Sequence, residues 1–327
     1  MTHYSQVEDQ DLPTPLHLDA WVEWNERKFG LTAVPLTFGA GGKAASLRSL
    51  LYVNGQGRVA MPPLSPHLPL SFTTTPTSKV DRIYSQWVDL AGALAEQIAS
   101  RGIAGRINLP PTFVDARPFQ WAGLQAEWRY TFVADLGTDT APDSAVRKRL
   151  RKAQSRGYTV EVGGDPGELH ACLLETERRK GFAHRLTRRD LKLIGDAMGP
   201  SHYRVYLVRD ASGTAVSAGA RLLSEGGWGV DWLQGTSPDH LENGANQLIY
   251  QEVFRDLRAQ GVRLFDLGGA NIRAVARAKS SWGHPLVPYI SLTAPSATKH
   301  LRQAMVGSLG PVLPALRRAR AVTRRGA

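Results

Sequence analysis

The chain has 327 residues and a formal net charge of +11, with 42% hydrophobic and 21% charged residues. These are ordinary globular values, and no apolar run approaches the roughly 20 residues that a membrane-spanning helix requires. A single cysteine, Cys172, excludes an internal disulfide, and the first twelve residues lack the basic start and apolar core of a secretory signal. We therefore expect a cytoplasmic protein, with two domains because the length exceeds what one core usually supports.

The first half of the chain predicts a mixture of strands and helices. A strand over 47–53 is expected to turn at Asn54-Gly55 into a second strand over 58–61, because Asn-Gly is typical of hairpins. Five prolines between residues 60 and 78 disfavour regular structure and predict a stiff loop. The remaining expected elements are a long helix over 79–101 and strands over 106–109 and 128–136, followed by a linker over 137–142.

In the second half, glycines and turn residues mark the ends of the expected strands and helices. The expected strands are 158–162, 203–209, 215–223, 228–233, 262–267 and 286–292, and the expected helices are 166–181, 187–199, 244–260 and 274–281. The segment Lys279-Ser-Ser-Trp282-Gly283 echoes Pro118-Phe-Gln-Trp121-Ala-Gly123 at the end of the first half. An internal structural repeat is therefore predicted. The fold class is α+β, a mixed α/β arrangement in which each half forms a mixed, mostly antiparallel sheet flanked by helices.

Positive charge is concentrated in two segments. Residues 147–192 hold 13 basic and 6 acidic residues, and residues 312–327 hold 5 basic and no acidic residues. The expected helix over 143–156 carries Arg147 and Arg151 among six outward-facing basic residues. Such concentration favours a polyanionic or phosphate-bearing partner, although solvated helix faces would give the same pattern. No motif for sequence-specific DNA binding and no paired metal-ligand spacing is present, so neither function is expected.

Several short segments together resemble one known family. They are Arg147-Lys-Arg-Leu-Arg-Lys-Ala153 with Gly157, Glu177-Arg-Arg-Lys-Gly181-Phe182, Gly244-Ala245-Asn246, Asp266-Leu-Gly-Gly269 and Lys279-Ser-Ser-Trp282-Gly283. These segments are similar to the FemAB-like branch of the GNAT superfamily of N-acetyltransferases, in which Phe is usual at the position of Trp282. The resemblance implies an acyltransferase with two tandem GNAT-like domains: a degenerate one over 1–137, a catalytic one over 138–300, and a basic helix or tail over 301–327.

The resemblance also suggests which residues carry the chemistry. It places a functional lysine at Lys279, whose charge can stabilise the oxyanion of acyl transfer. Asp231 and Asp266 lie in or at the ends of expected central strands, where either can position the amine or accept its proton. For Asp266, a structural role in holding the Gly268-Gly269 turn is an equal alternative.

The expected substrate-binding residues are less closely tied to one role. Arg185 is the candidate ligand for a substrate phosphate, and Asn246 either caps its helix or binds substrate. The remaining expected substrate-binding residues are Trp282, Arg147 and Arg151.

The acyl donor is the open question. Related acetyltransferases bind coenzyme A pyrophosphate at the turn that here contains Gly244 and Ala245, but Leu241 replaces the leading basic or amide residue and Asn246 the final small residue. We expect no metal and no tightly bound cofactor, and aminoacyl-tRNA as the donor substrate, because its phosphates suit the basic helix. An acyl-coenzyme A-dependent N-acetyltransferase is the first alternative, and a catalytically inactive polyanion-binding module is the second.

Overall fold

The computed structural model describes residues 11–39 and 44–295. Its N-terminal half begins with a short 3-10 helix, η2, and helix α1, and continues with an antiparallel sheet in the order β1-β2-β3. The elements of this half are η2 (Pro15–His17), α1 (Asp19–Phe29), β1 (Thr32–Phe38), β2 (Ser46–Val53), β3 (Leu70–Thr73), α2 (Val80–Arg101), β4 (Arg106–Asn108), α3 (Arg117–Trp121) and β5 (Gln125–Asp135).

Two sequence predictions in this half are corrected. The predicted strand over 58–61 is reduced to an isolated bridge between Val53 and Val59. The proline-rich segment over 60–78 is not wholly irregular, since it contains β3, which starts directly after Pro69 and pairs with β2. Because β3 is an edge strand and no proline lies within it, the prolines around it do not interrupt its hydrogen bonds.

The C-terminal half follows the predicted order of elements, with bounds that differ by a few residues. It contains α4 (Ser144–Ser155), β6 (Thr159–Val162), α5 (Pro166–Lys180), α6 (Arg188–Met198), β7 (Tyr203–Arg209), β8 (Ala215–Leu223), β9 (Trp228–Thr236), η3 (Pro238–Asn243), α7 (Ala245–Ala259), β10 (Leu264–Asp266), α8 (Arg273–Ser280) and β11 (Leu286–Thr293). Helix α5 ends where Gly181 adopts a left-handed conformation, as the glycine pattern predicts.

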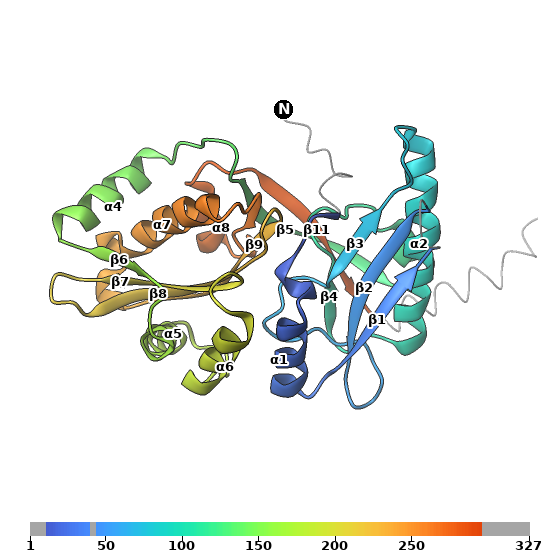
Figure 1. Cartoon of the computed structure of the whole chain (residues 1–327), viewed down its shortest axis with the longest axis horizontal. Helices are drawn as coiled ribbons and strands as arrows, with labels where there is room; N and C mark the ends of the chain where they lie inside the picture. The colour runs from blue at the N-terminus through green and yellow to red at the C-terminus, as the bar shows by residue number, and fades with distance from the viewer. Residues whose placement is uncertain (1–10, 40–43, 296–327) are drawn as a thin grey trace, which may run out of the picture.

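The two halves exchange their last strands. The eight-stranded sheet has the order β4-β11-β5-β10-β9-β8-β7-β6, in which only β10 and β9 are parallel. Thus β5, the last strand of the N-terminal half, pairs with β10, while β11, the last strand of the C-terminal half, pairs with β4. The strands β5 and β11 also pair with each other along their length, and Figure 1 shows them running between the two halves.

Helices cover both faces of the C-terminal part of this sheet. In Figure 1, α4, α7 and α8 lie on one face, and α5 and α6 lie on the other. A separate core in the N-terminal half packs α2 against its strands and takes in Ile290 and Leu292 of β11. The exchanged strand therefore contributes to the neighbouring core as well as to the sheet.

Candidate active site

The candidate site is a cavity of about 540 Å³ bordered by the end of α5, by β9 and by helices α7 and α8. It lies beside the point where β9 and β10 diverge. It is lined by Thr176, Arg179, Lys180, Asp231, Trp232, Gln234, Thr236, Leu241, Asn246, Tyr250, Gly268, Ala274, Val275, Ala278, Lys279 and Trp282. Four of the predicted residues, Lys279, Asp231, Asn246 and Trp282, thus share one cavity.

Asp231 is held at the cavity by two side chains. Its carboxylate accepts a hydrogen bond from the phenol of Tyr250 on α7, and it lies 3.1 Å from the guanidinium of Arg221 on β8. Burial, followed by the charge of Asp231, raises the pKa of Tyr250 well above its usual value, so the phenol stays protonated. The pair therefore presents a carboxyl group that a phenol hydroxyl holds in place.

Arg221 is fully buried beneath this acid. Its guanidinium donates to the carbonyl oxygen of Leu233 at 2.8 Å and to Oε1 of Gln234 at 2.8 Å, and it lies 5.4 Å from the Tyr250 ring centroid. A Cβ at Gly219 would overlap both the Arg221 guanidinium and the Gln234 amide, so glycine provides the space for this arrangement. A buried charge needs such partners, because an unpaired one would cost several kcal/mol or more.

A β-bulge shapes the strand at the same place. The register pairs Ala220 with Leu233 and Arg221 with Asp231, so Trp232 is the extra residue in β9. Bulges re-aim side chains and end regular pairing next to many active sites. Here the bulge turns Trp232 toward α1, where its indole packs against Trp21 and Trp24.

Lys279 reaches the cavity from α8. Its ammonium donates to the carbonyl oxygens of Leu267, Gly268 and Gly269, which we call the carbonyl cage, and the longest of these contacts is 3.3 Å, to Gly269. Burial lowers the pKa of Lys279, whereas the negative charges of Asp231 and Asp266 oppose this effect. The lysine is thus a restrained cation beside the Asp231 carboxylate.

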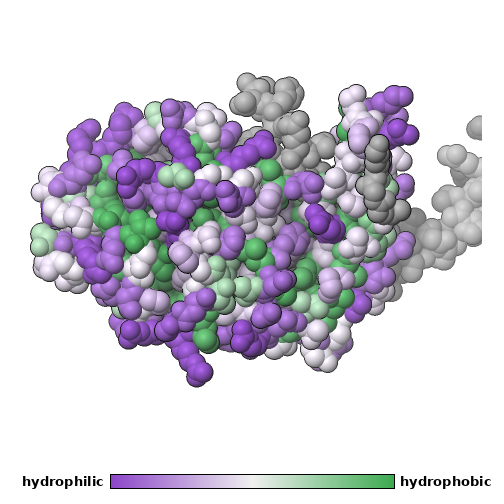
Figure 2. Space-filling model, in the orientation of Figure 1, coloured by the Kyte–Doolittle hydropathy of each residue, from purple (hydrophilic) through white to green (hydrophobic). Residues whose placement is uncertain are grey.

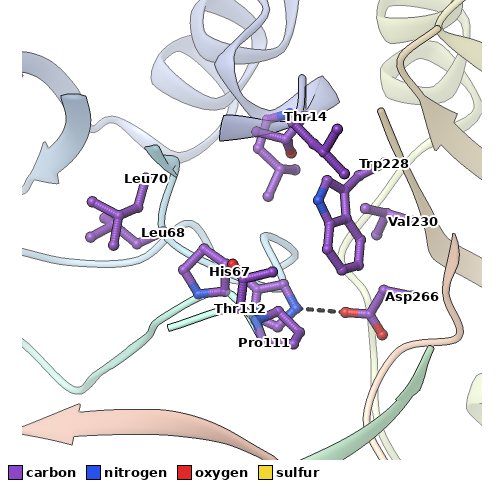
Figure 3. A pocket seen from close by; sticks show the side chains of 12 residues that line it. Thr14, His67, Leu68, Leu70, Pro111, Thr112, Trp228, Val230 and Asp266 are labelled. Carbon is purple, nitrogen blue, oxygen red and sulfur yellow. Dashed lines mark hydrogen bonds and ion pairs between the residues drawn. The ribbon is translucent and has the colours of Figure 1, made fainter. Parts of the chain in front are cut away.

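The structure separates Asp266 from this cavity. In the parallel register Asp266 is level with Val230, so the next residue, Asp231, points to the opposite face of the sheet. The Asp266 carboxylate instead lies against His67 of the N-terminal half, in a second, small cavity (Figure 3). It also accepts the Gly268 N–H at 2.8 Å, as the structural alternative predicts.

Positive charge near the cavity comes from residues other than Arg185. Arg179 and Lys180, at the end of α5, line the cavity, and burial followed by the charge of Arg179 lowers the pKa of Lys180. Arg185 is exposed, adopts a left-handed conformation with φ of 57°, and does not line the cavity. The positive charge on the cavity wall thus comes from Arg179 and Lys180 and not from Arg185.

Asn246 and Trp282 differ in what they offer a substrate. The Asn246 side chain lines the cavity and has no hydrogen-bond partner among the described residues. Trp282 is buried and packs on Phe254 and Tyr250, where it separates this cavity from another of about 290 Å³. Asn246 thus has free hydrogen-bonding groups, whereas Trp282 is mainly a wall of the site.

The turn before α7 is closed on one side by α4. Gly244 has φ of 86°, and a Cβ there would overlap the carbonyl oxygen of Arg149 on α4. Ala245 is fully buried in the core. The glycine is therefore explained by the close approach of α4.

Helix α4 forms a strongly basic surface beside the cavity. Its apolar stripe, Val146, Leu150 and Ala153, is buried as predicted. Lys152 bonds the carbonyl oxygen of Glu242, next to the cavity residue Leu241. The exposed cations of the helix form no ion pair with any described residue; they are Arg147, Lys148, Arg149, Arg151 and Lys152. In Figure 2 the surface is largely hydrophilic where α4 lies in Figure 1.

Two kinds of feature are absent from the described part of the chain. No group of three or more His, Cys, Asp or Glu side chains within residues 11–39 and 44–295 is placed to hold a metal ion. None of the described helices is both long and apolar enough to cross a membrane. The predicted basic tail over 301–327 lies outside the described residues.

Comparison with known proteins identifies the domain that holds this site. Residues 143–276 match the acetyltransferase (GNAT) domain family. Residues 143–276 thus form a GNAT acetyltransferase domain. The chain is accordingly an acyltransferase, as the sequence resemblance implies. No curated protein matches the sequence.

Solved structures extend the similarity to most of the chain, at the level of the fold. A crystal structure of FemX has a TM-score of 0.61 and 16% identity, covering 87% of this chain and 94% of FemX. The C-terminal domain of a putative lysylphosphatidylglycerol synthetase from Agrobacterium fabrum has a TM-score of 0.54 and 14% identity, covering 92% of this chain and 94% of that one. The predicted mixed α/β fold, with mostly antiparallel sheets flanked by helices, is thereby confirmed.

Arg221, Tyr250, Arg179 and Lys180 were not among the predicted site residues. One signal for Arg221 was present in the sequence, because an arginine stands within an otherwise apolar strand and must find buried partners there. Tyr250 gave no such signal, since an aromatic residue on the apolar side of a helix is equally typical of a core.

Proposed function

We propose that this acyltransferase moves an aminoacyl group from aminoacyl-tRNA to an amine. The observation that carries the proposal is the unpaired basic surface of α4, packed against the turn that borders the cavity. A tRNA backbone would neutralise these cations and release counterions, while its aminoacylated end entered the cavity. Arg179 and Lys180 would then meet the terminal phosphates.

The chemistry of the proposed transfer follows from the residues in the cavity. The amine attacks the ester carbonyl, forming a C–N bond, and the C–O bond to the ribose then breaks. Lys279 would stabilise the oxyanion by releasing its longest contact, the one to Gly269 at 3.3 Å. Asp231 would orient the amine and carry its proton toward the departing ribose hydroxyl, with Tyr250 fixing the carboxylate.

The family match supports a second candidate, an acyl-coenzyme A donor, because the matching domain family is described as one of acetyltransferases. Against this donor, α4 closes one side of the turn at Gly244 where related enzymes bind pyrophosphate. The name of the Agrobacterium neighbour, a putative lysylphosphatidylglycerol synthetase, denotes an aminoacylated product, which agrees with the first candidate.

Calorimetric titration of the purified protein with aminoacyl-tRNA, and separately with acetyl-coenzyme A, distinguishes the donors. We expect saturable tRNA binding that weakens as salt is raised, because counterions are released on binding. Saturable binding of acetyl-coenzyme A without tRNA binding would instead establish the second candidate. Binding of tRNA without any transfer to a panel of amines would favour an inactive polyanion-binding module.

A further inference from the structure

The second cavity lies between the two halves and contains a buried polar cluster. His67 precedes β3, and its Nε2 lies 2.6 Å from the Asp266 carboxylate at the end of β10 (Figure 3). Both side chains are almost fully buried, with exposed fractions of 8% and 2%. The contact therefore joins the N-terminal half to the strand that ends at the candidate active site.

His67 is held in place by its own loop. The Asn108 amide donates to the carbonyl oxygen of Pro66 at 3.0 Å, and the hydroxyl of Ser65 donates to the carbonyl oxygen of His67 at 3.1 Å. The imidazole packs edge-on against Tyr289 of β11 with ring centroids 5.3 Å apart. The ring thus has a fixed position from which to donate to Asp266.

Asp266 connects His67 to the backbone that follows β10. Besides His67, its carboxylate accepts the hydroxyl of Thr131 and the backbone N–H of Gly268. Burial raises the pKa of Asp266, but the hydrogen bond and charge of His67, with the bonds from Thr131 and Gly268, outweigh this effect and lower it. An ionised Asp266 is a strong acceptor that fixes the Gly268 peptide.

The same peptide belongs to the carbonyl cage of Lys279. Gly268 has φ of 70° and Gly269 has φ of 32°, so this segment adopts a conformation that side-chain-bearing residues rarely take. Its carbonyl oxygens, with that of Leu267, hold the Lys279 ammonium on the opposite side of the strand from Asp266. One peptide therefore links the buried cluster to the active-site cation.

We propose that His67 is a positioning residue for acyl transfer, which acts through Asp266 and the Gly268 peptide to hold Lys279 in its cage. His67 has an unpaired, buried Nδ1 and contacts neither Lys279 nor the active-site cavity. The small cavity beside it, about 30 Å³, has room for only one or two water molecules. The N-terminal half thus contributes to the active site without lining it. The inference rests on Lys279 serving the transfer proposed above.

The test reads the state of Lys279 directly and needs no substrate. Trace labelling with acetic anhydride, followed by peptide mass spectrometry, gives the reactivity of each lysine. In His67→Phe, which keeps a ring but removes the donor, we expect labelling of Lys279 to rise at least about threefold as its cage loosens. Lys180, which lines the same cavity, should keep its wild-type labelling and serves as the internal reference.

Three further variants separate positioning from general stability. His67→Gln, whose amide can still donate to Asp266, should restore labelling close to wild type. Ser49→Ala removes a buried hydrogen bond of the same half, from β2 to the carbonyl oxygen of Pro69, which is outside the relay, and should leave Lys279 unchanged. Thr131→Val, which removes another donor to Asp266, should raise labelling to a smaller extent, and it provides the test if His67→Phe does not fold.

A rise in Lys279 labelling in His67→Phe that is no greater than in Ser49→Ala, or that Lys180 shares equally, would overturn the inference. Because no donor is present in this experiment, its outcome does not depend on the result of the tRNA titration. The donor proposal and the positioning role can therefore fail separately.

Discussion

Lys279 is the cation best placed to act on a developing oxyanion, because it is restrained beside Asp231 in the cavity. Lys279→Met keeps most of the alkyl stem and removes the charge. We expect kcat for acyl transfer to fall at least about tenfold, since loss of one oxyanion donor typically costs more than this. Steady-state kinetics with thermal unfolding as a control measures the effect. Wild-type kcat in a folded variant would remove Lys279 from the mechanism.

His284 allows a second residue-scale prediction, about pH. Burial lowers its pKa from 6.5 to about 4, so the folded protein keeps it neutral where the unfolded chain takes up a proton. Its contribution to stability is therefore complete above pH 6.5 and is lost as the pH falls toward 4. In His284→Phe, which can still pack on Phe254, the free energy of unfolding should fall less steeply over this range. Urea unfolding at several pH values measures both slopes, and parallel curves would contradict the assignment.

Helix α4 is fixed to α7 at Gly244, which gives a prediction at the scale of elements. Gly244→Ala would both force a side chain into a left-handed conformation and overlap Arg149. We expect it to destabilise the protein by about 1–3 kcal/mol. The matched control is Gly92→Ala in α2, where a Cβ meets no atom within 4 Å and alanine should stabilise the helix by about 1 kcal/mol. Equal unfolding midpoints for the two variants would argue against the close approach of α4.

The charge of α4 can be tested apart from its packing. Replacing exposed Arg147 and Arg151 by alanine should weaken tRNA binding and lower the salt dependence by about two counterions, because each phosphate contact releases about one. A matched pair of substitutions, Arg27→Ala and Arg82→Ala, removes two exposed cations from α1 and α2 of the N-terminal half. Calorimetric titration across a salt series compares the pairs. An equal loss of tRNA affinity in both double variants would indicate a general electrostatic effect and no specific docking of tRNA on α4.

The elements and the site differ in how far the sequence predicts them. Helices such as α4 and α7 carry their apolar stripe at helical spacing, so their positions follow from local pattern. Asp231 and Lys279 were expected in one site and share a cavity, but the pattern alone did not predict that Asp266 faces away from both. That orientation depends on the register between β9 and β10, which is set by contacts distant in sequence.

At the scale of the whole molecule, the exchange of β5 and β11 was not predicted. The apolar pattern of either strand would suit its own half as well as the other, so only tertiary structure distinguishes the two pairings. The predicted division at residues 137 and 138 remains a proposal about the chain. If the chain were cut there, β5 would stay with the N-terminal half although it pairs with β10 of the other half. Likewise, β11 would stay with the C-terminal half although it pairs with β4.

This exchange predicts that the C-terminal half is not stable alone. A fragment of residues 138–327 would lack β5, so β10 would lose its antiparallel neighbour, and Asp266 would keep neither His67 nor Thr131. An exposed strand edge and a carboxylate that keeps only the Gly268 N–H of its three donors are both costly. We expect the fragment to be aggregated or unfolded by circular dichroism, and co-expression with residues 1–137 to restore a folded complex that elutes as one species. Cooperative unfolding of residues 138–327 by themselves, with a midpoint near that of the intact chain, would show that β5 is dispensable. In that case the shared sheet would join two halves that are already stable, and His67 could not be required to hold the end of β10.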